Sequence, residues 1–181
     1  PLVIAHLYPV EMNIYGDTGN VIALRQRLAW RGIEAVVEQV AVGDPFDFSR
    51  ADVVFAGGGQ DRSQVDVAAD LQHRRDDITA AVNAGTVFLT ICGTYQLFGR
   101  RFLTHDGQEI PGIGVFAAET IGGSRRMIGN VVVDSPFGRL VGFENHSGRT
   151  MLDPDQEPLG TVLKGFGNND ETGEEGAVVH N

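Results

Sequence analysis

Residues 85–99 read Gly-Thr-Val-Phe-Leu-Thr-Ile-Cys-Gly-Thr-Tyr-Gln-Leu-Phe-Gly, which predicts a strand, a tight turn and a short helix in succession. Residues 87–91 are apolar except for Thr90 and rich in β-branched types, which is typical of a strand buried on both faces within a parallel sheet. A turn at Cys92 and Gly93 would expose the cysteine side chain at the carboxyl edge of that sheet. This is the arrangement of a nucleophile elbow, with cysteine in place of serine.

Cys92 is the only cysteine in the sequence. Taken alone, a cysteine at the end of an apolar strand is more often a small buried hydrophobe than a nucleophile, because free cysteine is among the most buried residue types. The segment by itself therefore leaves a structural and a catalytic role open.

The composition excludes several classes of protein. A formal net charge of -10 over 181 residues argues against a nucleic-acid binder, which needs a basic face, and against attachment to an anionic membrane surface. The single cysteine excludes an internal disulfide framework and favours a reducing, cytoplasmic location. No apolar run is long enough for membrane insertion, and the length suits one domain, which we predict over residues 1–181.

The sequence gives no support for a cofactor or a metal ion. It contains no Gly-x-x-x-x-Gly-Lys-Ser/Thr loop for nucleotide phosphates, and its few histidines and one cysteine lack the spacing of metal ligands. We therefore predict neither.

The first half alternates predicted strands and helices. Strands are predicted at residues 2–7, 33–40, 52–56 and 87–91, with one helix ending near residue 31 and another over 64–83. Strand–helix–strand order implies right-handed crossovers and parallel pairing. Asp17 or Asn20 is predicted to cap the first helix, and Gly32 to end it.

Gly57, Gly58 and Gly59 follow the third predicted strand. One glycine normally suffices for a turn, so three favour a loop whose backbone comes very close to a ligand or to a neighbouring turn. A flexible loop is the alternative.

The second half changes character. A hairpin is predicted over residues 101–110, with its turn at Asp106-Gly107. Further strands are predicted at 115–119, 127–133, 140–144 and 160–164, and antiparallel pairs with short loops are the simplest arrangement for them. Residues 165–175 are rich in Gly, Asn and Glu, which predicts a solvated loop or a disordered edge. The whole chain is thus predicted as an α/β fold, with a central, mainly parallel sheet flanked by helices and an antiparallel extension in the second half.

Four segments stand together: Tyr15-Gly-Asp-Thr-Gly-Asn20, Gly57-Gly-Gly-Gln-Asp-Arg62, Leu89-Thr-Ile-Cys-Gly-Thr-Tyr-Gln96 and Gly142-Phe-Glu-Asn-His-Ser-Gly-Arg-Thr150. Their order and spacing resemble the GatD family, the glutamine amidotransferase subunits of lipid II isoglutaminyl synthase. More broadly, they resemble the class I glutaminase domains of the cobyric-acid-synthase type. The resemblance covers essentially the whole chain, and the first and last segments are its most specific parts.

The resemblance implies that the Cys92 thiolate attacks the side-chain carboxamide of L-glutamine, releases ammonia and forms a glutamyl thioester that is then hydrolysed. A helix amino terminus behind the elbow would favour the thiolate. The backbone N–H groups of Gly58 and Gly93 are the candidates for the oxyanion hole, where losing one donor typically costs about 10²–10³ in rate.

Arg126 matches the position where this family uses an arginine to hold its substrate, and a guanidinium suits the α-carboxylate of glutamine. Gln96 is the second candidate for substrate binding that the resemblance implies. Arg125 competes with Arg126, because neighbours in a strand face opposite sides. A solvated arginine at the start of a strand is the alternative interpretation of Arg126.

The resemblance also implies a histidine as general acid and base, within a Gly-Thr-Tyr-x-His-Gly segment. The end of the sequence, residues 176–181, matches the positions just before that segment, so the catalytic histidine is expected beyond Asn181 and His180 is not expected to fill the role. His146 is expected to have a structural or interface role. Thr94 departs from the Cys-Gly-Gly elbow common in the family, which is acceptable only if its φ is negative.

The function implied is that of a glutaminase supplying ammonia to MurT, a Mur-ligase-like partner that amidates D-glutamate in the peptidoglycan stem of lipid II. One alternative is a non-catalytic interaction subunit with the same fold. Others are an amidotransferase of the cobyric-acid-synthase type with another substrate, and a different cysteine hydrolase on a related sheet.

Overall fold

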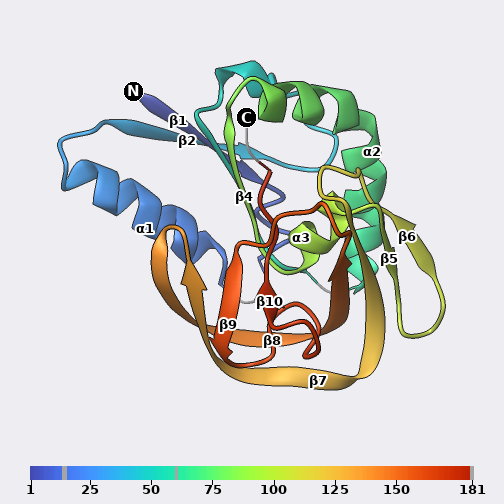
Figure 1. The fold of residues 1–181 in the computed structure, drawn as a ribbon. Helices are drawn as coiled ribbons and strands as arrows, with labels where there is room; N and C mark the ends of the chain where they lie inside the picture. Colours follow the sequence, from blue (N-terminus) through green and yellow to red (C-terminus); the bar gives the residue numbers. More distant parts are fainter. Residues whose placement is uncertain (14–15, 60, 180–181) are drawn as a thin grey trace. The chain divides into compact units, whose positions relative to one another are not determined.

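A parallel sheet in the first half of the chain carries the predicted elbow. Its strands are β1 (Leu2–Leu7), β2 (Ala35–Val40), β3 (Val53–Ala56) and β4 (Val87–Thr90), in the order β2-β1-β3-β4, and every neighbouring pair is parallel (Figure 1). The carboxyl ends of all four strands therefore meet at one edge of the sheet. The order of the strands reverses between β1 and β3, and in open parallel sheets ligands bind above such a reversal.

The computed structural model describes residues 1–13, 16–59 and 61–179, and the chain divides into two units, Pro1–Tyr95 and the residues from Gln96 onward. The expectation of one domain over residues 1–181 stays a prediction. The α/β class, with a mainly parallel sheet and helices, is confirmed.

The helix α1 (Thr18–Ala29) covers one face of the parallel sheet, where Val21 is buried against Ile4 and Phe55. The backbone N–H of Thr18 donates to Oδ1 of Asn13 at 2.8 Å. Asp17 occupies the N-cap position, as predicted, but its side chain makes no capping hydrogen bond, and Asn20 lies inside the helix and is not its cap.

The opposite face of the sheet carries the short helix η1 (Phe48–Arg50) and the long helix α2 (Asp61–Asn83). Phe88 of β4 points to this face, because strand residues alternate, and its ring stacks on Phe48 with 6.3 Å between centroids. Helix α2 in turn packs on η1. The sheet thus has a helical layer on each side.

The prediction that residues 87–91 form a central strand buried on both faces is wrong. β4 stands at the end of the sheet order, and its side chains alternate between exposed and half-buried, with Val87 58% and Leu89 42% exposed. Both lie in the sheet rows of Val53 and Phe55, on the face that α1 covers, but beyond the reach of the core that α1 forms. The apolar run correctly predicted a strand, but it did not predict that the strand lies at the edge of the sheet.

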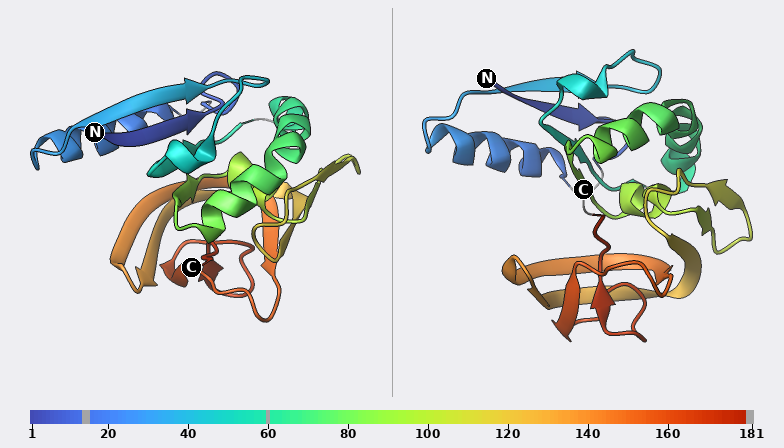
Figure 2. Two further views of the ribbon diagram at one scale, coloured as in Figure 1. Left: turned by 90° about the horizontal axis from the view of Figure 1, so that it is seen from above. Right: turned by 45° about the horizontal axis from the view of Figure 1, so that its top comes forward.

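A second, mixed sheet forms most of the second unit. β7 is its centre and pairs with β8 and β9 in antiparallel fashion and with β5 in parallel, and the sheet continues to β6 and β10 at its two ends (Figure 2). Its strands are β5 (Arg101–Leu103), β6 (Glu109–Pro111), β7 (Ala118–Ser135), β8 (Gly138–Leu152), β9 (Gly160–Lys164) and β10 (Glu174–Glu175). The predicted antiparallel extension and the hairpin at Asp106-Gly107 are confirmed.

Two details of the second unit differ from prediction. The strands expected at 115–119 and 127–133 are one strand, β7, which continues through an irregularity between Gly122 and Met127. Residues 165–175 are not a solvated loop, because Asn168 is only 4% and Asn169 only 2% exposed. Their amides donate to backbone carbonyls at 3.0 and 2.9 Å, so their polarity is satisfied inside the protein.

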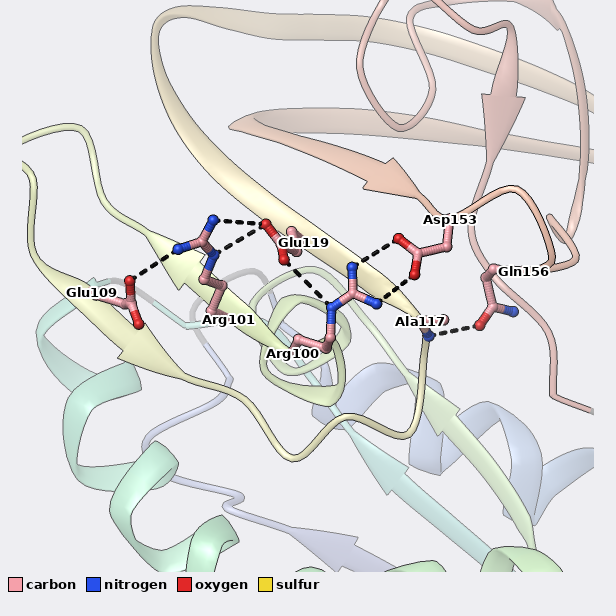
Figure 3. Close-up of polar contacts among 7 residues, drawn as sticks. All are labelled: Arg100, Arg101, Glu109, Ala117, Glu119, Asp153 and Gln156. Carbon is pink, nitrogen blue, oxygen red and sulfur yellow. Dashed lines mark hydrogen bonds and ion pairs between the residues drawn. The ribbon is translucent and has the colours of Figure 1, made fainter.

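Two arginines at the start of β5 form a network of ion pairs on the surface of the second unit (Figure 3). Arg100 binds Asp153 through both terminal nitrogens at 2.5 and 2.7 Å and lies 3.4 Å from Glu119. Arg101 binds Glu119 at 2.9 and 3.0 Å and Glu109 at 3.2 Å. Isolated exposed ion pairs stabilise little, but here the shared Glu119 and the two-pronged contact to Asp153 connect β5, β6, β7 and the end of β8.

Gln156 joins the last described residues to the same unit (Figure 3). Its Oε1 accepts the backbone N–H of Ala117 at 2.8 Å, and its Nε2 donates to the carbonyl of Val178 at 2.8 Å. Glu157 and Val178 form an antiparallel bridge alongside.

Candidate active site

The elbow forms as predicted. β4 ends at Thr90, α3 (Gly93–Phe98) begins at Gly93, and the partly exposed Cys92 lies between them. Cys92 has a φ of 52°, in the left-handed region that costs a non-glycine residue strain. Residues held in this region concentrate at functional sites, because the surrounding structure must compensate for the strain. Cys92 is therefore partly exposed and held on a tight turn, unlike a buried structural cysteine.

The triple-glycine loop lies directly against the elbow. A Cβ placed on Gly93 would come within 3.0 Å of the backbone nitrogen of Gly59 and 2.4 Å of Nε2 of Gln64. A Cβ on Gly57 would meet the Met12 carbonyl oxygen at 2.4 Å. Glycine is required at Gly57 because a backbone oxygen occupies the space of a side chain, and the backbone of Gly59 also approaches Gly93 closely. This close approach favours the first of the two interpretations of residues 57–59.

Thr94 connects these two segments. Its side chain is fully buried, and its hydroxyl donates to the Gly57 carbonyl at 2.6 Å. Thr94 lies in the first turn of α3 and is not among the residues with positive φ, so the departure from Cys-Gly-Gly is accommodated without strain. In a trans peptide the C=O and the next N–H point in opposite directions, so this bond also sets the direction of the Gly58 N–H.

Asp17 is the residue near the elbow whose position the sequence did not predict. Its carboxyl lies where a Cβ on Gly57 would stand, it is only 5% exposed, and its Oδ2 has no hydrogen-bond partner among the described residues. His6 on β1 is 1% exposed. Burial lowers the pKa of His6, and the Asp17 carboxylate partly opposes this shift. The sequence pointed to this region only through the segment of residues 15–20, which contains Asp17. Tyr15 of that segment lies outside the described residues.

A buried network supports the loop after β1. The Tyr8 hydroxyl donates to Oδ2 of Asp70 at 2.8 Å, and the same carboxylate accepts Nε of Arg74 at 2.5 Å and the Gly43 N–H at 3.0 Å. Tyr8 is fully buried with a φ of 53°, and its carbonyl accepts the N–H of Met12 at 2.9 Å. The carbonyl oxygen of Met12 lies close to Gly57, and its sulfur lies close to Gly59.

The two predicted substrate-binding residues belong to the second unit. Arg126 is exposed, and its guanidinium makes one long hydrogen bond of 3.3 Å to Oδ1 of Asn145. Arg125 is committed elsewhere, because it pairs with Asp170 at 3.2 Å and lies over the ring of Phe166. Of the two neighbours, Arg126 is thus the freer to bind a carboxylate.

Gln96 is 9% exposed, and its side chain packs against Gly148, where a Cβ would meet Nε2 of Gln96 at 2.3 Å. The roles of Gln96 and Arg126 toward glutamine remain predictions.

The segment 142–150 holds the loop that follows β9. Glu144 is 8% exposed and accepts the backbone N–H groups of Phe166 and Gly167 at 2.8 and 3.0 Å. Nδ1 of His146 lies 2.8 Å from the Gly148 carbonyl, which agrees with the expected structural role. Burial, with the nearby Glu144 carboxylate, raises the pKa of Glu175 to about 7.

His180, Gln60 and Asn181 lie outside the described residues. Within residues 1–13, 16–59 and 61–179, no group of three or more His, Cys, Asp and Glu side chains is arranged to bind a metal ion. Among the helices of those residues, none combines the length and the apolarity that crossing a membrane would take.

The site geometry agrees with comparisons with known proteins. Residues 3–181 match the family model of the CobB/CobQ-like glutamine amidotransferase domain. The GatD subunit of lipid II isoglutaminyl synthase (glutamine-hydrolyzing) from Staphylococcus aureus is 40% identical over 181 residues, covering 99% of this chain and 74% of that protein. The GatD subunit from Streptococcus pneumoniae is 40% identical over 183 residues, covering 99% of this chain and 70% of that protein.

A solved structure of a glutamine amidotransferase supports the fold, with a TM-score of 0.57 at 14% identity, over 87% of this chain and 79% of that one. A match along nearly the whole sequence, together with a cysteine elbow beside a glycine loop, leaves no ambiguity about the family. The chain belongs to the family of CobB/CobQ-like glutamine amidotransferase domains.

Proposed function

We propose that this protein is the glutaminase subunit of a lipid II isoglutaminyl synthase. It hydrolyses L-glutamine at Cys92 and supplies ammonia to MurT, a Mur-ligase-like, ATP-dependent partner that amidates D-glutamate in the stem peptide of lipid II. The observation that carries the proposal is the strained, partly exposed Cys92 beside the backbone of Gly57–Gly59. The GatD names of the two 40% identical relatives supply the substrate and the assembly.

The chemistry follows from the residues at the elbow. The Cys92 thiolate attacks the side-chain carboxamide carbon of glutamine, and the oxyanion that forms is stabilised by the N–H groups of Gly93 and Gly58. The C–N bond breaks, ammonia leaves, and water then hydrolyses the thioester to glutamate and the free thiol. We propose that a histidine on the carboxyl side of Asn181 moves the protons, and that Arg126 and Gln96 hold the amino-acid part of the substrate.

Two features support ammonia delivery to a partner in the cytoplasm. The sequence contains no Gly-x-x-x-x-Gly-Lys-Ser/Thr loop for nucleotide phosphates, and we assign ATP binding to the partner. The sole cysteine is partly exposed and reactive only as a thiol, which suits a reducing compartment.

The test measures two products from the natural protein together with its Mur-ligase-type partner. We expect Cys92→Ala to abolish glutamate release and glutamine-dependent amidation of lipid II. Ammonium chloride should restore amidation in the same variant, because free ammonia bypasses the glutaminase step. Equal glutamate release by wild type and Cys92→Ala would contradict the proposal and favour a non-catalytic subunit.

A further inference from the structure

The outward side of α1 differs in composition from the rest of this acidic protein. The segment from Thr18 to Ile33 contains three arginines and no Asp, Glu or Lys, whereas the whole chain has a net charge of -10. Its exposed positions include two large apolar side chains, Trp30 at 73% and Ile22 at 64% exposed. Ordinary solvated helix surfaces carry Lys, Glu and Asp, so this helix requires another explanation.

The spacing of these residues gives the exposed side a defined pattern. At 100° per residue, Val21, Leu24 and Leu28 form the stripe that packs on the sheet. Ile22 and Trp30 lie on the opposite side of the helix, near Gln26 and Ala29. Arg25 lies on one flank of the outward side that carries Ile22 and Trp30, and Arg27 and Arg31 lie on its other flank. We name this set, from Ile22 to Arg31, the α1 surface.

The three arginines of the α1 surface are not committed within the chain. Arg25 and Arg27 make no ion pair among the described residues, and Arg31 donates only to the carbonyl of Arg27 at 2.9 Å. Six other arginines are paired with carboxylates, whereas Arg75, Arg126 and Arg139 make no ion pair among the described residues; the six are Arg50, Arg74, Arg100, Arg101, Arg125 and Arg149. Three unpaired guanidinium groups around exposed apolar side chains form a surface that fits negative charge.

We propose that the α1 surface is the docking site for an acidic face of the Mur-ligase-type partner subunit, a step that rests on the proposed function. Protein interfaces are enriched in Trp and Arg and depleted in Lys, Glu and Asp, which is the composition found here. Trp30 supplies the apolar anchor, and the arginines pair with carboxylates at the rim. A protein is favoured over an anionic membrane because all 24 Asp and Glu residues lie outside the segment from Thr18 to Ile33, and the net negative charge of the chain opposes its approach to an extended anionic surface.

The experiment measures the dissociation constant between the natural protein and its Mur-ligase-type partner by calorimetry. Trp30→Ala is expected to weaken association about 30-fold, as the loss of a central Trp anchor does. Arg27→Glu together with Arg31→Glu should weaken it at least as much and reduce its dependence on salt concentration. The matched controls are Phe137→Ala, at a position 70% exposed, and Arg139→Glu, both at the turn end of the β7–β8 hairpin and expected to change affinity less than twofold.

Glutaminase activity and thermal melting of each isolated variant separate this inference from the proposed function. The residues of the α1 surface are exposed, and none of them belongs to the proposed catalytic site. Both readouts should therefore match wild type. Unchanged affinity in the α1 variants would overturn the inference while leaving the proposed function standing. No association by the wild-type pair would overturn both. Binding of wild type, but not of the α1 variants, to phosphatidylglycerol vesicles, with subunit affinity unchanged, would assign the surface to a membrane instead.

Discussion

The hydrogen bond from Thr94 to the Gly57 carbonyl gives the sharpest test of how the site is built. Thr94→Val keeps the shape of the side chain and replaces the hydroxyl with a methyl group. The change removes a bond of 2.6 Å inside the protein and leaves a buried carbonyl without that donor. Such a loss costs about 1–3 kcal/mol. For a chain of this size, a cost of about 1.5 kcal/mol lowers the melting temperature by roughly 3–6 °C.

The effect on catalysis should exceed the effect on binding. Without the hydroxyl, the peptide unit between Gly57 and Gly58 is free to rotate, and the Gly58 N–H no longer points in a fixed direction. We expect kcat for glutamate release to fall about tenfold, which is less than the 10²–10³ for outright removal of an oxyanion donor. KM should change less than twofold, because we propose that Arg126 and Gln96, and not the Gly58 N–H, hold the amino-acid part of glutamine.

The assay follows glutamate release by the protein with its partner, alongside a thermal melt of each variant. Thr94→Ser retains the hydroxyl and should recover most of kcat. Thr79→Val removes an exposed hydroxyl that bonds to the Arg75 carbonyl on α2, and it should leave both readouts unchanged. A Thr94→Val variant with wild-type kcat would refute the idea that this bond orients the Gly58 peptide unit.

Three further substitutions test other parts of the structure. Arg126→Ala should raise KM for glutamine at least tenfold with little change in the melt, whereas Arg125→Ala should leave KM unchanged; equal KM values in both would contradict the assignment. Gly57→Ala, whose Cβ would lie 2.4 Å from a backbone oxygen, should reduce kcat more than tenfold, while Gly129→Ala, with open space around it, should be neutral in the same assay. Glu175 has a pKa raised to about 7, mainly by burial, so its ionisation opposes folding increasingly as the pH rises from about 4.5 to 7. Glu175→Gln should therefore raise the melting temperature at pH 8 and not at pH 4; a gain only at low pH would contradict this sign.

The elements that local patterns determine were predictable. Apolar runs identified all four strands of the parallel sheet, and the switch from strand to helix at Cys92 correctly predicted an elbow. The run at residues 87–91 could not report its place in the sheet, because the exposure of Val87 and Leu89 depends on which strands are neighbours. That is a property of the whole fold and not of the segment.

Polar residues were the harder part to predict. Asp17 reads as a helix cap in sequence, and only the close approach of Gly57 reveals its buried position. The sequence predicts that Asn168 and Asn169 are solvated, but in the structure their side-chain amides donate to backbone carbonyls. Whether a polar side chain meets water or protein is decided by contacts between residues far apart in the chain, which spacing and composition do not encode.

The long ribbon of β7 and β8 bears on how the protein reaches this structure. Its two arms close on the short turn between Ser135 and Gly138, and each successive pair, from Ser135 with Gly138 outward to Ala118 with Leu152, joins residues already brought near by the previous one. Pairing of β1 with β3, by contrast, must bring Ile4 to Val53 across an intervening strand and helix. Contacts between residues close in sequence form faster than contacts between residues far apart in sequence. We therefore expect β7 and β8 to pair first and the parallel sheet that carries Cys92 to assemble later.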